Sequence, residues 1–254
     1  MPLDTSIYTL AGLRLDGRRW NELRRIHGQI STQSASDGSS YFEMGNTKVL
    51  CTVLGPQEQR RSGGGGGQQQ KATIEAGISI AGFSGVDRKR RGRNDKRIQE
   101  MNHMIESAFE STLQLHLYPH STISITLHVL SQDGSLLAAC LNAATLALID
   151  AGIPMTDYVS GCTVGTTSSF MDNEGEADPL MDLNGLEENE VPFLTLGTSG
   201  GEDKVNVLMM ETRVQMARLE AMISVALDGC GQIRGILDGI VRAHGQKVLQ
   251  AKMS

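Results

Sequence analysis

A run of basic side chains at residues 88–97 is the part of the sequence best suited to binding chemistry. It has a local charge of +6, whereas the whole chain has a formal net charge of -6, and its basic residues are Arg88, Lys89, Arg90, Arg91, Arg93, Lys96 and Arg97. The run predicts a polyanion site, because Lys and Arg release counterions from phosphates and Arg adds bidentate hydrogen bonds. A solvated charge run or a nuclear localisation patch is the alternative. Aromatic residues make up only 4% of the chain, so we do not expect base stacking to dominate.

Residues 171–190 carry the opposite charge and contain no Lys or Arg. Their acidic residues are Asp172, Glu174, Glu176, Asp178, Asp182, Glu187, Glu188 and Glu190. Carboxylates at such density could serve in acid catalysis or coordinate Mg²⁺ in phosphoryl chemistry. Acidic loops without catalytic roles are common, and composition alone favours that plainer interpretation.

A third feature is the sequence Asp133-Gly134-Ser135 directly before a long apolar stretch. At the start of a helix, such residues could hold a phosphate on exposed backbone N–H groups. Ordinary N-capping by Asp133 or Ser135 is the interpretation we favour, because both are typical cap residues. The next two residues, Leu136 and Leu137, provide no cation for a phosphate.

The remaining reactive residue types indicate neither a metal site nor a cofactor. Cys51, Cys140, Cys162 and Cys230 form no Cys-x-x-Cys pair, so we expect buried reduced thiols. The six histidines are scattered along the chain. No apolar stretch reaches the roughly 18 residues of a membrane span, and the N-terminus lacks the order of a secretion signal. We expect a soluble intracellular protein.

Apolar periodicity predicts the elements that position these residues, strands with period two and helices with spacings of three and four. Strands are predicted at 26–34, 41–44, 48–54, 72–80, 123–129, 158–165, 191–196 and 204–211, and helices at 95–113, 136–151 and 216–241. Strands followed by helices occur twice, which predicts two similar α/β halves at 13–154 and 155–250. The Gly- and Gln-rich residues 62–70 are interpreted as a loop insertion in the first half.

Several short motifs, spread over nearly the whole chain, resemble those of the RNase PH family. They include Asp16-Gly17-Arg18-Arg19, Gly45-Asn46-Thr47-Lys48, Gln132-Asp133-Gly134-Ser135 and Leu183-Asn184-Gly185-Leu186-Glu187-Glu188-Asn189. Among family members, the chain is most similar to the eukaryotic exosome ring subunit whose archaeal counterpart bears the phosphorolytic site. The resemblance implies the RNase PH fold, an α/β (α+β) architecture of two similar β-sheet-plus-helix halves that resemble the ribosomal protein S5 domain 2-like fold.

The resemblance also implies a degenerate catalytic site. Active members hold phosphate with a Gly-Ser/Thr-Arg sequence after the Asp-Gly turn, whereas this chain has Gly134 and Ser135 followed by Leu136. Of the two acidic residues of active members, Asp182 corresponds to the first and Glu190 is a substitute for the second. We therefore expect no enzymatic activity. The alternative is a phosphate-dependent 3'-5' exoribonuclease that uses Asp182 and Glu190.

RNA contacts and partners are implied in the same way. Lys96 and Arg97 match residues that contact single-stranded RNA in the family, and Arg60 and Arg61 belong to a loop near the pore entrance. The implied assembly is a six-membered ring of RNase PH-like subunits with cap subunits of the S1 and KH types and an associated hydrolytic 3'-5' exoribonuclease. The implied location is the nucleus, including the nucleolus, and the cytoplasm.

Overall fold

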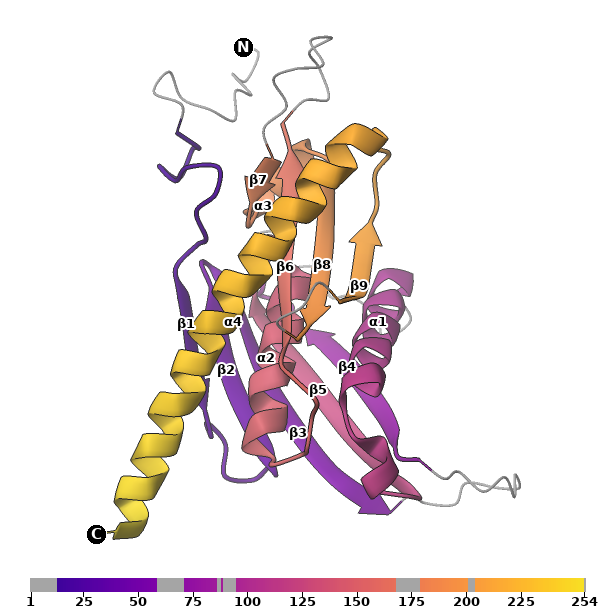
Figure 1. The fold of residues 1–254 in the computed structure, drawn as a ribbon, viewed down its shortest axis with the longest axis vertical. Coiled ribbons are helices and arrows are strands. Elements are labelled where there is room, and N and C mark those ends of the chain that lie inside the picture. The colour runs from indigo at the N-terminus through magenta and orange to yellow at the C-terminus, as the bar shows by residue number, and fades with distance from the viewer. Residues whose placement is uncertain are drawn as a thin grey trace.

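The computed structural model of the chain describes residues 13–58, 71–85, 88, 95–167, 179–200 and 204–253. These residues form two sheets, one above the other in Figure 1. The first has the strand order β1-β2-β3-β5-β4 and contains β1 (Ile26–Ile30), β2 (Gly38–Met44), β3 (Thr47–Glu58), β4 (Thr73–Ile80) and β5 (Ser121–Ser131). The second has the order β7-β6-β8-β9 and contains β6 (Val159–Thr166), β7 (Pro179–Met181), β8 (Phe193–Ser199) and β9 (Val205–Met210).

The first sheet begins as an antiparallel meander. Strands β2 and β3 form a hairpin in which Met44 pairs with Thr47, and the turn residue Gly45 has a φ of 61° that suits glycine. Strand β4 instead pairs with β5 in parallel. A parallel pair needs a crossover connection, which helix α1 (Lys96–Thr112) provides. The crossover places the start of α1 near the end of β5.

Helix α2 (Leu136–Asp150) lies between the two sheets and packs against β2 and β3 of the first and β6 and β8 of the second. Almost every one of its residues is buried, as expected for a helix that is apolar all round. Its buried polar side chains have partners: Asn142 exchanges two hydrogen bonds with the Gly161 backbone, and Thr145 donates to Val159 O at 2.7 Å. One apolar core therefore spans both sheets.

Helix α4 (Met216–Met253) crosses the molecule diagonally (Figure 1). It packs against β6, β7 and β8 and then against β1 of the first sheet. Gly28 on β1 permits this contact, because a Cβ there would lie 2.8 Å from the Ile240 side chain. The helix therefore ties the second sheet to the first.

The elements predicted from the sequence are confirmed, with different bounds at several ends. The first strand ends at Ile30 rather than at residue 34, and α4 continues twelve residues beyond 241. Strand β7, helix α3 (Gly185–Glu190) and the 3-10 turn at Leu115–Leu117 were not predicted. The insertion at 62–70 lies outside the described residues. No helix in the described part of the chain is long and apolar enough to cross a membrane.

Candidate functional site

The turn before α2 has an unusual backbone that packs against the segment leading into α3. Gly134 and Ser135 have positive φ values of 74° and 52°. A Cβ on Gly134 would lie 2.6 Å from Leu183 O, so only glycine fits this close approach. The start of α2 is therefore fixed directly against the residues that follow β7.

The expectation that Asp133 or Ser135 caps α2 is wrong, because both side chains bind elsewhere. Helix α2 has no side-chain cap hydrogen bond. Ser135 Oγ lies 3.2 Å from Asp182 Oδ1 and 3.0 Å from Leu183 O, either of which can accept its one hydroxyl proton, whereas Asp133 Oδ1 accepts from Gly185 N at 3.0 Å. Neither Asp133 nor Ser135 therefore satisfies the first-turn N–H groups of α2 with its own side chain.

Asp182, one of the two candidate catalytic acids, is fully buried and bonded to Arg24. Its Oδ1 accepts from Arg24 Nε at 3.0 Å and from Arg24 Nη2 at 2.8 Å, and its Oδ2 accepts from the Arg24 backbone N–H at 2.8 Å. Glu190, the other candidate, is the exposed last residue of α3. The two carboxylates therefore have different surroundings, one in a buried ion pair and the other in solvent.

A second buried ion pair holds α3 in place. The Arg14 guanidinium is fully buried and binds both carboxylate oxygens of Glu187 as well as the carbonyl oxygens of Met181 and Asp182. Glu187 also forms a capping box with Asn184 at the start of α3. Arg14 thereby holds α3 in its orientation through Glu187.

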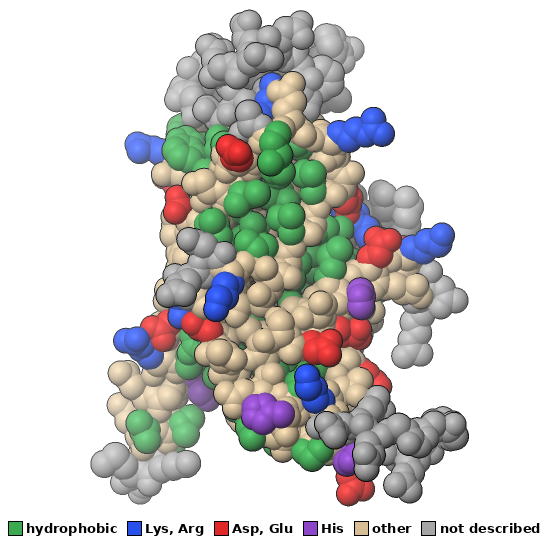
Figure 2. All heavy atoms as spheres, turned by 45° about the vertical axis from the view of Figure 1, so that its right-hand side comes forward, with side chains coloured by type: hydrophobic (Ala, Val, Ile, Leu, Met, Phe, Trp, Pro, Cys, Tyr) green, Lys and Arg blue, Asp and Glu red, His purple; other side chains and the backbone are tan. Residues whose placement is uncertain are grey.

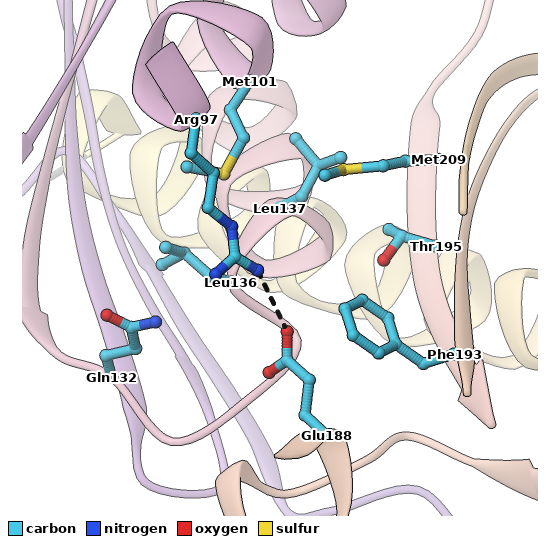
Figure 3. A pocket seen from close by; sticks show the side chains of 9 residues that line it. All are labelled: Arg97, Met101, Gln132, Leu136, Leu137, Glu188, Phe193, Thr195 and Met209. Carbon is cyan, nitrogen blue, oxygen red and sulfur yellow. Dashed lines mark ion pairs between the residues drawn. The ribbon is translucent and has the colours of Figure 1, made fainter. Parts of the chain in front are cut away.

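The carboxylate that α3 presents to the start of α2 is that of Glu188, a residue that the sequence analysis did not select. It lines a small pocket together with Arg97, Met101, Gln132, Leu136, Leu137, Phe193, Thr195 and Met209. Figure 3 shows Arg97 extending from α1 toward Glu188 between apolar walls. The closest guanidinium nitrogen lies 3.8 Å from Glu188 Oε1 and 3.2 Å from Glu211 Oε1.

The electrostatics of this pocket are dominated by burial. Burial raises the pKa of the Glu188 carboxyl above its usual value, and the Arg97 charge and the Ser135 backbone N–H act in the opposite direction. A carboxylate thus lies beside the N-terminus of α2, where an external anion would otherwise lie. The position of Glu188 beside α2 is visible only in the folded structure, because in the sequence Glu188 is one of eight acidic residues in the same segment.

Lys96 and Arg97 form the first two positions of α1, and both are exposed, although Arg97 is shared between two carboxylates. Asp95 caps the helix through a 3.2 Å hydrogen bond from Arg97 N. Arg88 is also exposed. The remaining basic candidates lie outside the described residues, namely Arg60, Arg61, Lys89, Arg90, Arg91 and Arg93. Within the described residues, no cluster of His, Cys, Asp or Glu is suited to a metal ion.

Comparison with known proteins places both sheets in one family. The model described as the 3' exoribonuclease family, domain 1, matches residues 22–154, and that described as domain 2 of the same family matches residues 157–229.

Relatives that match over most of their length are named exosome complex components. The chain is 40% identical to the exosome complex component SKI6 of Saccharomyces cerevisiae, with 95% of each chain covered. It is 41% identical to the exosome complex component RRP41 homolog of Arabidopsis thaliana, covering 87% of this chain and 88% of the homologue. Against human exosome complex component RRP41 the identity is 38%, with 92% of each covered.

A solved structure supports the fold. The crystal structure of rice (Oryza sativa) Rrp46 matches with a TM-score of 0.76 at 24% identity, covering 90% of this chain and all of that one. The arrangement of two sheets around α2 is therefore an RNase PH-type fold.

Proposed function

The chain belongs to the 3' exoribonuclease family of RNase PH domains, and from this membership we propose that it is a non-catalytic, RNA-channel-lining subunit of an RNA exosome ring. Relatives named exosome complex components match it over nearly their whole length. The two halves of the RNase PH fold would be residues 13–154 and 155–250. Each carries one sheet, and α2 and α4 join them.

The non-catalytic proposal rests mainly on the two side chains beside the start of α2, Glu188 and Leu136. A phosphate there would meet the Glu188 carboxylate and the apolar Leu136, and the nearby Arg97 is already paired with two carboxylates. A missing guanidinium removes charge-assisted hydrogen bonds of roughly 1.5–3 kcal/mol each. Inorganic phosphate, the nucleophile of phosphorolysis, would therefore bind poorly.

The alternative, a phosphate-dependent 3'-5' exoribonuclease using Asp182 and Glu190, is less consistent with the geometry. Both oxygens of Asp182 already accept hydrogen bonds from Arg24, in a buried setting. To act as an acid or a metal ligand, Asp182 would have to leave that ion pair, and breaking a buried pair costs about 3–5 kcal/mol. Glu190 lies at the exposed end of α3.

The proposed RNA contacts are Lys96 and Arg97 together with Arg88 and the basic residues that lie outside the described part of the chain. Lys96 and Arg97 are exposed at the start of a helix beside the pocket, and their charges suit phosphate groups of a single strand. Contacts of this kind are independent of sequence and sensitive to salt. We propose no cofactor.

In the proposed assembly, five other RNase PH-like subunits complete the ring, and subunits of the S1 and KH types form the cap. An associated hydrolytic 3'-5' exoribonuclease degrades the RNA that the ring guides to it, in rRNA maturation and mRNA turnover. The proposed location is the nucleus, including the nucleolus, and the cytoplasm.

A phosphorolysis assay tests the proposal. The assembled ring, free of its associated nuclease, is incubated with end-labelled RNA, inorganic phosphate and Mg²⁺, and nucleoside diphosphates are measured. We expect none above background, and RNA shortening only when the hydrolytic nuclease is added. Release of nucleoside diphosphates that depends on added inorganic phosphate would overturn the proposal in favour of the phosphorolytic alternative.

A further inference from the structure

Phe83 is a solvent-exposed aromatic residue in the turn that follows β4. The residue is 68% exposed, more than any other Phe or Trp in the described part of the chain. Single exposed apolar residues are common on protein surfaces and need no explanation by themselves. The position of Phe83 is informative because of what surrounds it.

The turn that carries Phe83 is held by backbone hydrogen bonds on both sides. Ala81 N donates to Val129 O at 3.0 Å, and Ser84 N donates to Ala81 O at 2.9 Å. On the far side, Gln132 N donates to Ser84 O at 3.0 Å. A ring on such a fixed turn loses little conformational entropy when a ligand packs on it.

The same turn adjoins both the pocket and the basic residues. Gln132, which bonds to Ser84, lines the pocket together with Arg97. On the other side, Arg88 N donates to Gly85 O at 3.2 Å, so the first basic residue of the run follows the turn directly. Phe83 thus lies on a turn that leads into the exposed Arg88 and that is bonded, through Gln132, to the lining of the pocket that contains Arg97.

We propose that Phe83 is a stacking platform for one base of single-stranded RNA whose phosphates are bound by exposed cations such as Arg88 and Arg97. This inference rests on the proposed RNA-lining function and adds a contact to a base. An aromatic face flanked by Arg and Lys is the combination that binds single strands without sequence preference, because every base has a π-face. A protein partner would more often cover a contiguous apolar patch than a single ring beside cations.

The test compares assembled rings that contain the wild-type chain, Phe83→Ala, Phe83→Leu or Phe83→Tyr. Dissociation constants for a fluorescent single-stranded RNA are measured at several salt concentrations. We expect Phe83→Ala to weaken binding about tenfold and Phe83→Tyr to bind as the wild type does. Phe83→Leu should resemble Phe83→Ala, because it keeps an apolar side chain but no ring. The salt dependence should be the same in all four, because Phe83 neutralises no phosphate.

A second substrate isolates the base. The same RNA is prepared with an abasic ribose at each position in turn. At one position, loss of the base should weaken the wild-type ring about as much as Phe83→Ala does and should leave the Phe83→Ala ring unchanged. Equal effects on both rings at every position would overturn the stacking role. Loss of ring assembly in Phe83→Ala would also overturn it, and would identify Phe83 as a subunit contact.

A further variant in the same experiment tests the RNA-lining function separately from the stacking role of Phe83. A ring carrying Lys96→Ala and Arg97→Ala should bind RNA more weakly and with a smaller salt dependence. If that ring binds normally, the RNA-lining function fails whatever Phe83 does. If it binds weakly while Phe83→Ala binds as the wild type does, only the stacking inference fails.

Discussion

Arg24 and Asp182 form a buried ion pair that joins residues 158 positions apart in the sequence. Two guanidinium nitrogens lie 2.8 and 3.0 Å from one carboxylate oxygen, and the Arg24 backbone N–H binds the other. The pair connects the segment before β1 to the end of β7, beside the turn that starts α2. Asp182 therefore has a structural role in this molecule.

Replacement of Asp182 by Ala should lower the free energy of unfolding by about 3–5 kcal/mol, because it leaves the Arg24 charge buried and unpaired. Urea denaturation of the purified protein measures the loss. Glu190→Ala is the matched control, and at its exposed position the change should stay within about 0.5 kcal/mol. Equal stability of the two variants would contradict a structural role for Asp182.

Glu188→Gln should make stability less dependent on pH. Burial raises the pKa of Glu188 in the folded state, so its contribution to stability is fully present below the unfolded-state value near 4.5 and is lost as the pH rises through the folded-state value. Between acidic and neutral pH, the wild type should therefore lose stability that Glu188→Gln does not lose. Denaturation curves for both proteins across this range measure the difference, and parallel pH profiles would refute it.

Removal of Lys96 and Arg97 together, with Ala or Glu, should weaken RNA crosslinking to the ring and leave assembly intact. With Ala, the slope of log affinity against log salt should fall by about one to two, one phosphate contact for each residue. Arg242→Ala is the control, since Arg242 is 76% exposed and belongs to a surface ion pair with Asp238 on α4. A crosslinking yield equal to that of the control ring would remove the channel role from both residues.

The four cysteines should be unreactive in the folded protein. Burial raises the pKa of Cys140 to about 12 and that of Cys230 to about 11, and it raises those of Cys51 and Cys162 well above the usual value. Because the thiolate is the reactive form, a thiol reagent at pH 8 should modify none of them until denaturant is added. Rapid modification of any cysteine without denaturant would show that the core opens locally.

Gly134→Ala should destabilise the protein strongly, because a Cβ would meet the Leu183 and Asn184 backbone and the φ of 74° disfavours alanine. Gly231→Ala is the matched control on an exposed part of α4, where a Cβ would meet nothing within 4 Å. That change should stabilise by about 0.5–1 kcal/mol through helix propensity. Thermal melting of both variants gives the comparison, and shifts of the same sign would count against the steric argument.

Most of the helices and strands could be predicted because they are long enough to show a repeating pattern of apolar residues. Strand β5 alternates buried and accessible residues over most of its length, and α2 is apolar apart from Asn142, Thr145 and its last residue, Asp150. Strand β7 has only three residues and α3 only six, too few for a period to emerge. The capping box of α3, Asn184 with Glu187 three residues later, was a readable signal that was missed.

The candidate site was less predictable, because its chemistry depends on contacts between distant segments. Nothing in the local sequence indicates that Arg14 and Arg24 are buried, since arginine is usually exposed. Asp133 and Ser135 have the composition of helix caps, but partners on the α3 side of the molecule bind their side chains instead. The sequence around Glu188 does not distinguish it from the neighbouring acidic residues. Only the folded position of α3 shows that Glu188 lines the pocket.

The path of helix α4 has a consequence for how the chain is made. Its 38 residues, about 57 Å in length, start beside the second sheet and contact β1 at Gly28 through Ile240. During synthesis, the strands of the first sheet emerge long before the residues that cover β1. The apolar surface beside Gly28 therefore stays uncovered until the residues around Ile240 have been synthesised.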